Sequence, residues 1–354
     1  MKRHGMAAAI LSLAVLLAAC SPASEPVSGE PSAVSWDSLT VESGLDLQYA
    51  DQFTVDYYTG GYALIHIVDG NDYLVVPENK PVPDGLADTT VVLTQPLDHI
   101  YLVATSAMDL FCALDGIGSI RLSGTDERGW YIDEAKAAMQ NGAMLYAGKY
   151  SAPDYELIYA EQCDLAVEST MIYHSPEVKE QLERLGVPVL VERSSYESSP
   201  LGRMEWLKLY GVLLNREEAA EAIYQQALDS LRPVIEQENT GKAVVFFYIN
   251  SNGSANVRKS NDYVAKMIEM AGGTYIFSDL GNDNALSTMN MQMEMFYTGA
   301  KDADVIIYNS TIDGELHSID ELLAKSPLLA DFKAVRNGDV WCTGQNLFQS
   351  TMGL

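Results

Sequence analysis

Apolar and polar positions alternate in the first part of the chain that has the composition of a folded domain. Three short runs rich in β-branched and aromatic residues are separated by the pairs Gly60-Gly61 and Gly70-Asn71, and they cover 53–58, 62–68 and 72–77. Glycine and asparagine accept the backbone angles of tight turns. The pattern therefore predicts antiparallel strands in this segment.

Beyond Pro96 the pattern changes to apolar runs that alternate with amphipathic segments. Ser175 and Pro176 supply the start of one helix and Gly186 its end, as caps commonly do. Strands that alternate with helices form parallel βαβ units. We expect strands at 99–105, 164–170, 187–193, 243–249, 303–309 and 338–343, and helices at 106–114, 152–162, 175–186, 262–273 and 318–327.

The longest helical pattern lies between two series of these units. From about 202 to 237 apolar residues recur every three to five positions, with a bend expected at Gly211 and Asn215. The predicted fold class is α/β, with two α/β lobes joined by a long connecting helix and a ligand cleft between the lobes. The expected boundaries are an N-terminal lobe at 41–200, the connecting helix at 201–238 and a C-terminal lobe at 239–354.

The first forty residues read as an export signal followed by a tether. Lys2 and Arg3 precede an apolar stretch that is too short to span a bilayer as a helix. Leu17-Ala18-Ala19-Cys20 looks like the lipobox of bacterial lipoproteins, which implies a signal peptide at 1–19 and a lipid anchor on Cys20. Residues 20–40, rich in Ser, Pro, Ala and Glu, are the expected flexible tether. The predicted location is the outer face of the cytoplasmic membrane; the alternative is an ordinary cleavable signal.

The charge of the chain excludes one class of partner. The formal net charge is −27, from 49 acidic and 22 basic residues. Such a surface repels nucleic acid and anionic lipid, so we expect no nucleic-acid partner. The scarcity of cations also makes each arginine and lysine near a ligand cleft informative.

The two halves of the chain repeat one local arrangement. A helix that carries Glu156 precedes Asp164 and an apolar strand, and a helix that carries Glu294 precedes Asp304 and another apolar strand. A solvated surface carboxylate explains either glutamate taken singly. Their occurrence at the same place in both halves favours a shared task.

Five segments carry a resemblance that covers most of residues 85 to 348. In their order and spacing they resemble the substrate-binding lipoproteins of bacterial ABC importers for iron complexes, the group that handles siderophores, heme and cobalamin. The resemblance implies two lobes held by a rigid helix, a ligand between them, and a sequence that stops short of the family's closing helices. The segments are APDYELIYAEQCDLAVEST (152–170), YESSPLGRMEWLKLYGVLLNREEAAEAIY (196–224), NVRKSNDYVAKMIEMAGGTYIF (256–277), MEMFYTGAKDADVIIYN (293–309) and FKAVRNGDVW (332–341).

The resemblance also implies partners. The ligand would be a ferric siderophore or a similar metal chelate, and the protein would deliver it to an ABC permease dimer with its ATPase subunits. In the family a glutamate on each lobe meets arginines of the permease, and Glu156 and Glu294 match those positions.

Basic and aromatic residues near the expected cleft are the candidates for ligand binding. Arginine presents a planar fork of donors that suits carboxylate or catecholate oxygens, and aromatic rings stack on aromatic ligands. For each residue the alternative is structural, a surface ion pair or ordinary packing. The candidates are Arg203, Arg258, Lys259, Lys149, Trp130, Tyr131, Tyr150 and Tyr263.

The histidines argue against a bare-metal ligand. His66, His99, His174 and His317 form no close-spaced group, so a zinc or manganese site is disfavoured against a chelated metal, and no metal-ligating residues are predicted. Relatives often carry histidine where Ser199 stands, so this segment is not expected to ligate iron directly.

The sequence contains no nucleophile elbow, no zinc-protease motif and no phosphate-binding glycine loop. We therefore predict a solute-binding component of an ABC importer, with no catalytic residues and no cofactor. The alternatives are a lipid-anchored hydrolase or sensor module, or a binding protein for heme, a corrinoid or a bare metal ion.

Overall fold

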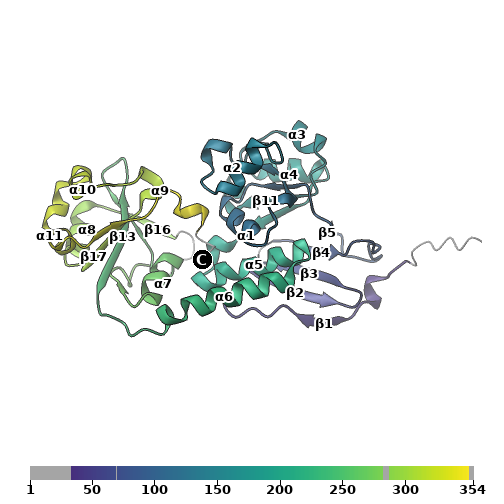
Figure 1. The fold of residues 1–354 in the computed structure, drawn as a ribbon, viewed down its shortest axis with the longest axis horizontal. Helices are drawn as coiled ribbons and strands as arrows, with labels where there is room; N and C mark the ends of the chain where they lie inside the picture. Colours follow the sequence, from purple (N-terminus) through teal and green to yellow (C-terminus); the bar gives the residue numbers. More distant parts are fainter. Residues whose placement is uncertain (1–32, 69, 282–286, 351–354) are drawn as a thin grey trace, which may run out of the picture.

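The computed structural model describes residues 33–68, 70–281 and 287–350. Two α/β lobes lie side by side, and a long helix runs from one toward the other along one edge of the molecule (Figure 1). A separate antiparallel sheet extends the first lobe. The predicted signal peptide 1–19, Cys20 and most of the tether lie outside the described residues.

The antiparallel sheet is built by the alternating segment at the start of the body. Its strand order is β1-β2-β3-β4-β5, with β5 parallel to β4 and the other pairs antiparallel. Gly60 and Gly61, with φ of 87° and 86°, form the turn between β2 and β3. The strands are β1 (Val41–Gly44), β2 (Phe53–Tyr58), β3 (Tyr62–Ile67), β4 (Asp72–Val76) and β5 (Thr90–Thr94).

The predicted tether extends too far along the chain. Residues 35–40, which composition assigned to it, belong to this sheet's outer face. The backbone N–H of Trp36 donates to Asp84 at 2.8 Å, and the Trp36 ring lies 4.7 Å from that of Tyr58. A single tryptophan with a partner ring provides enough apolar area to order a segment that is otherwise polar.

The N-terminal lobe contains a parallel sheet in the order β12-β11-β6-β7-β8. Leu165 and Val167 of β11 face one apolar core, and Ala166 faces the other. The strands are β6 (Ile100–Leu102), β7 (Ile120–Ser123), β8 (Leu145–Tyr146), β11 (Leu165–Ser169) and β12 (Val189–Glu192), with a small hairpin of β9 (Gly148–Lys149) and β10 (Ala152–Pro153). The helices are α1 (Met108–Ala113), α2 (Asp133–Gln140), α3 (Tyr155–Ala160) and α4 (Pro176–Arg184).

The connector between the lobes is two helices rather than one. α5 (Pro200–Leu214) ends at Asn215, whose φ of 55° is left-handed and stops the helix, and α6 (Glu217–Ile235) follows. Nearly every residue of α5 is buried, because it packs on the antiparallel sheet and on α6. α6 is the helix that runs along the edge of the molecule toward the second lobe (Figure 1).

The C-terminal lobe contains a mixed sheet in the order β16-β14-β13-β17-β18, with β15 paired to β13. β14 and the edge strand β16 are antiparallel to their neighbours, and the sequence pattern did not predict them. The strands are β13 (Ala243–Ile249), β14 (Ala255–Arg258), β15 (Thr274–Tyr275), β16 (Thr288–Met291), β17 (Val305–Tyr308) and β18 (Val340–Cys342). The helices are α7 (Tyr263–Met270), α8 (Met293–Ala300), α9 (Ser310–Asp313), α10 (Ile319–Lys325) and α11 (Lys333–Asn337).

The predicted α/β class with two lobes and an interlobe helix is confirmed. In both lobes the loops that follow the parallel strands lie at the carboxyl edge of the sheet, where open α/β sheets bind ligands. Among the described residues, no helix combines the length and the apolar character needed to cross a membrane.

Candidate functional site

Arg203 and Tyr263 meet where the two lobes face each other. Arg203 lies near the start of α5 in the N-terminal lobe, and Tyr263 begins α7 in the C-terminal lobe. The guanidinium carbon of Arg203 lies 4.0 Å from the centre of the Tyr263 ring, which is a cation–π contact. The fold therefore brings together two residues that the sequence analysis assigned to the cleft.

The loop after β12 fixes the Arg203 guanidinium. Nη1 of Arg203 donates to the carbonyl of Ser194 at 3.3 Å, and Oε1 of Glu192 accepts from the Ser194 N–H at 2.6 Å. Burial raises the pKa of the Glu192 carboxyl, and its hydrogen bonds with Ser194 and the charge of Arg203 oppose that rise. Arg203 itself is only 4% exposed, so its positive charge acts inside the protein.

Arg258 is held by a second buried carboxylate. Oδ2 of Asp262 lies 3.4 Å from Nη1 of Arg258, and Oδ1 of Asp262 accepts from the Val264 N–H at 2.9 Å, which caps α7. Burial raises the pKa of Asp262, and Arg258 is the strongest opposing influence, with Arg203 adding to it. Both arginines therefore stabilise one interlobe aspartate. The sequence analysis missed Asp262, although an aspartate directly before an apolar helix is an N-cap signal.

A groove of about 450 Å³ lies beside this cluster on the C-terminal lobe. Lys259 borders it, and Nδ2 of Asn256 donates to Oδ1 of Asn290 at 2.9 Å along its wall. A few polar groups set among apolar ones are typical of sites for small molecules. The lining residues are Asn256, Lys259, Leu280, Gly281, Thr288, Met289 and Asn290.

A larger hollow of about 570 Å³ lies elsewhere, between the antiparallel sheet and α6. Lys208 borders it and pairs with Glu221 at 3.0 Å. Its other charged residues are acidic, namely Asp46, Glu217 and Glu218. It contains no residue that the sequence predicted for the ligand.

The remaining predicted ligand residues lie on the N-terminal lobe in different environments. Trp130 is 1% exposed, and its indole N–H donates to Oγ of Ser123 and to the Thr125 carbonyl, both at 3.1 Å. Its ring is therefore part of the core rather than of an open surface. Tyr131 and Lys149 are exposed and Tyr150 is half-buried, on segments that follow β7 and β8 at the carboxyl edge.

The segment after β18 crosses from the C-terminal lobe to the N-terminal lobe. Gln349, which is 1% exposed, donates from Nε2 to the Gly129 carbonyl at 2.7 Å and accepts at Oε1 from the Tyr131 N–H at 2.8 Å. It thus ties the loop after β7 to the far lobe. No sequence pattern indicated this contact, because it joins residues more than two hundred positions apart (|i−j| of 220 and 218).

Glu156 and Glu294 occupy matching places on the two lobes. Each is exposed and lies in the first turn of its helix, α3 or α8. Each helix leads into a central parallel strand, β11 or β17. Ser199 accepts a hydrogen bond from the Leu201 N–H at 3.2 Å and caps α5.

Residues 122–347 match the family described as Periplasmic binding protein. The chain therefore belongs to this family, whose members are binding proteins rather than enzymes.

Two uncharacterized lipoproteins of Methanocaldococcus jannaschii are similar over most of their length. One is 27% identical over 333 residues, which is 88% of this chain and 77% of the relative. The other is 23% identical over 306 residues, which is 82% of this chain and 75% of the relative.

Solved structures of binding proteins share the fold. The periplasmic heme-binding protein HutB of Vibrio cholerae superposes with a TM-score of 0.57 at 16% identity, over 70% of this chain and 90% of HutB. The catecholate-siderophore binding protein VctP of the same organism gives 0.55 at 17% identity, over 71% of this chain and 86% of VctP. These likenesses establish the two-lobe architecture.

Proposed function

We propose that this protein is the extracytoplasmic solute-binding component of an ABC importer and that it captures a ferric siderophore or related metal chelate between its lobes. The observation that carries the proposal is the convergence of Arg203, Arg258 and Lys259 at the interlobe face of an otherwise strongly acidic protein. Two of the structural neighbours bind heme and a catecholate siderophore by their own descriptions, and such ligands carry oxygens that accept from cations.

The groove beside Lys259 is the proposed seat of the chelate. The Lys259 ammonium and the side-chain amides of Asn256 and Asn290 would supply donors for ligand oxygens. Leu280 and Met289 would supply apolar contacts. Arg203 and Arg258 act one layer further in. They hold Asp262 and the Tyr263 ring in place behind the groove.

The remaining parts of the proposal concern delivery. Cys20 would carry the lipid that holds the protein at the outer face of the cytoplasmic membrane, and Glu156 and Glu294 would dock on a permease dimer. The exposure of both glutamates at matching places supports the second part. Charged pairs at a rim mainly steer encounter and orientation.

Titration of intrinsic fluorescence with a ferric catecholate, a ferric hydroxamate, heme, cobalamin and free Zn²⁺ tests the ligand. We expect saturable binding of one chelate, and a loss of about tenfold or more for Lys259→Ala, since a buried charge-assisted contact contributes about 1.5–3 kcal/mol. The matched control is Lys266→Ala, which removes the same charge from α7 at a lysine paired with Glu269. Absence of binding to every chelate, or equal loss in both variants, would contradict the proposal.

A further inference from the structure

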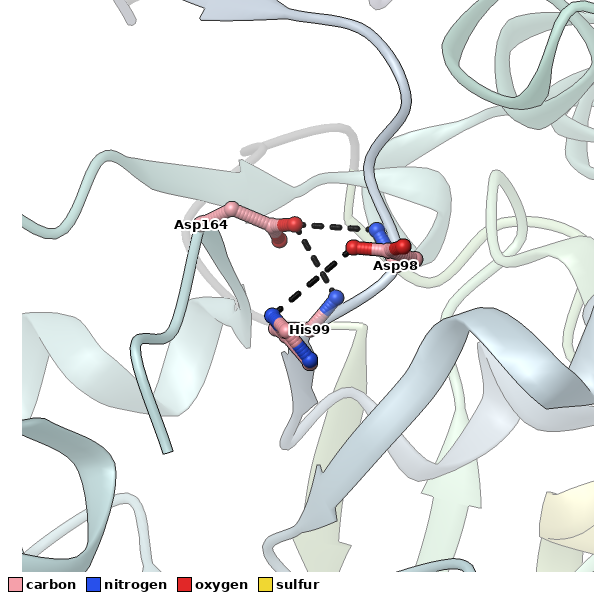
Figure 2. A group of neighbouring side chains, drawn as sticks. All are labelled: Asp98, His99 and Asp164. Atoms are coloured by element: carbon pink, nitrogen blue, oxygen red, sulfur yellow. Dashed lines mark hydrogen bonds and ion pairs between the residues drawn. The ribbon is translucent and has the colours of Figure 1, made fainter. Parts of the chain in front are cut away.

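The amino ends of β6 and β11 hold a group of side chains that the ligand cleft does not use. Asp164, directly before β11, accepts at Oδ2 from the N–H groups of Asp98 and His99, each at 2.9 Å (Figure 2). Its other oxygen, Oδ1, is buried and has no hydrogen-bond partner among the described residues. A buried carboxylate oxygen without a donor is unfavourable unless a water molecule or a cation lies against it.

Asp98 and His99 bring further metal-ligating atoms close to the Asp164 carboxylate. One carboxylate oxygen from each aspartate and one ring nitrogen of His99 lie within 4.8 Å of one another. The side chains of His99 and Asp98 are 44% and 60% exposed, so both can rotate to close on an ion. Figure 2 shows the three side chains arranged as a triangle, with the Asp98 carboxylate joined to the His99 ring by an ion pair of 3.7 Å.

The C-terminal lobe has an aspartate, Asp304, at the position equivalent to Asp164, and there a lysine compensates the negative charge. Asp304, directly before β17, accepts from the Ala243 N–H at 2.8 Å just as Asp164 accepts from His99. The strand registers make the two sites equivalent, because Leu165 pairs with Ile100 and Val305 pairs with Val244.

The remaining oxygen distinguishes the two sites. Oδ1 of Asp304 binds the ammonium of Lys333 at 2.5 Å, whereas Oδ1 of Asp164 has no donor among the described residues. At the positions equivalent to Lys242 and Ala243 the N-terminal lobe carries Asp98 and His99. The N-terminal lobe therefore offers two further possible ligands beside Asp164, whereas in the C-terminal lobe Lys333 binds the equivalent aspartate, Asp304.

Arg121, on the neighbouring strand β7, forms hydrogen bonds with other groups. Nε of Arg121 binds Glu161 at 2.8 Å, and its Nη1 donates to the carbonyls of Gly142 and Ala143 at 2.8 and 2.7 Å. None of these hydrogen bonds of Arg121 reaches Asp164.

We propose that Asp98, His99 and Asp164 form a binding site for a divalent transition-metal cation, with Zn²⁺ as the best-matched ion. An imidazole nitrogen with two carboxylate oxygens is a donor set that zinc accepts and that calcium and magnesium, which prefer oxygen ligands only, do not. Solvent fills the remaining coordination position, since two of the three ligands are half exposed. The site lies at the amino edge of the sheet, opposite the carboxyl edge that faces the cleft, and is separate from the proposed chelate.

Calorimetric titration of the purified full chain with Zn²⁺ tests this assignment. We expect one zinc ion to bind per chain. Zinc affinity should fall in His99→Ala and in Asp98→Asn by more than the ~10–100-fold loss that follows removal of a hydrogen bond that only supports a metal ligand. Asp304→Asn is the matched control, because it changes the equivalent aspartate of the other lobe and should leave zinc affinity unchanged. His66→Ala, which removes a histidine paired with a single aspartate, Asp72, should also leave it unchanged.

The visible spectrum of the Co²⁺ form gives a second measurement that does not depend on affinity. We expect ligand-field bands without thiolate charge transfer, which separates this site from the exposed Cys342. The proposal is overturned if the wild-type chain binds no zinc, or if His99→Ala and Asp98→Asn bind it as tightly as the wild type. Retention of zinc binding in Lys259→Ala is expected, and its loss would move the ion to the cleft and overturn the proposal.

Discussion

Asp164 in the N-terminal lobe and Asp304 in the C-terminal lobe directly precede equivalent strands, and each accepts a hydrogen bond from the backbone at the amino end of the neighbouring strand. The ammonium of Lys333 compensates the negative charge of Asp304, whereas the main influence on the Asp164 carboxylate is its removal from water. The pKa of Asp304 is accordingly lowered, mainly by its hydrogen bond with Lys333, and the pKa of Asp164 is raised, mainly by desolvation. The topology that the two lobes share therefore sets the position of the aspartate in each lobe, but it does not set which group binds that aspartate.

The same contrast recurs four residues further along each strand. Tyr308 of β17 and Glu168 of β11 are both fully buried. The Tyr308 hydroxyl donates to Asp313 at 3.2 Å and accepts from the Ile249 N–H at 3.4 Å. Both oxygens of Glu168 have no hydrogen-bond partner among the described residues, and burial raises its pKa to about 8. The N-terminal lobe thus carries buried acidic groups where the C-terminal lobe has satisfied ones, at corresponding positions of one repeated unit.

The largest expected effect tests whether the two lobes act as a pair. Replacing Glu156 and Glu294 together with alanine should abolish uptake in cells, because docking on both halves of a permease dimer is lost, while chelate affinity stays nearly unchanged. Each single variant should retain part of the uptake. Uptake and binding are measured by transport of a labelled chelate and by fluorescence titration.

The control for that experiment is the pair Glu180→Ala and Glu269→Ala. These exposed glutamates also lie one on each lobe, and each has a lysine or arginine partner on its own helix. If uptake survives in the Glu156 and Glu294 double variant, neither glutamate docks on a permease, and both are ordinary solvated surface residues. Loss of chelate binding there would place them in the cleft.

A smaller effect concerns stability and pH in the N-terminal lobe. Between the ordinary pKa of a glutamate and about 8, folded Glu168 retains a proton that the unfolded chain has released. The free energy of unfolding should therefore fall as pH rises through this window and level off above pH 8, by about 1.4 kcal/mol for each unit of pKa shift. Glu168→Gln should remove this dependence and stabilise the protein by several kcal/mol at pH 9.

Urea unfolding at pH 6 and pH 9 measures this difference. Tyr308→Phe is the matched variant in the C-terminal lobe, and it should destabilise by about 1 kcal/mol without a change in pH dependence in this range, since it removes a satisfied hydroxyl. A Glu168→Gln variant that is less stable than wild type at pH 9 would mean that the carboxylate has a stabilising partner in solution.

The smallest effect is expected on the surface of the C-terminal lobe. Lys333→Ala removes the cation beside Asp304 and makes this site resemble the one at Asp164. Because the pair is exposed to solvent, its loss should change the unfolding midpoint only slightly, and less at high salt than at low salt. A large, salt-independent loss of stability would show that the ammonium is needed structurally.

Most of the fold could be predicted because its elements are encoded locally. The run Ala243–Ile249 coincides with β13, and the capping residues Ser175 and Pro176 mark the start of α4. β14 and β16 escaped prediction because they are short and partly polar, and pairing rather than composition holds them in the sheet. The site was predicted in part. Arg203, Lys259 and Tyr263 were identified by their charge or ring, but nothing in the pattern showed that Trp130 belongs to the core.

The sequence by itself determined the alternation of strands and helices beyond Pro96, the break at Asn215, the acidity of the surface and the repetition of a helix, an aspartate and a strand in both halves. These properties depend on neighbours within a few residues. Tertiary structure alone decided that His99 lies beside Asp164, that Arg203 and Arg258 share Asp262, and that Gln349 returns to Gly129. Each of those contacts joins segments that lie far apart along the chain or on different elements, so their chemistry arises only when packing places them together.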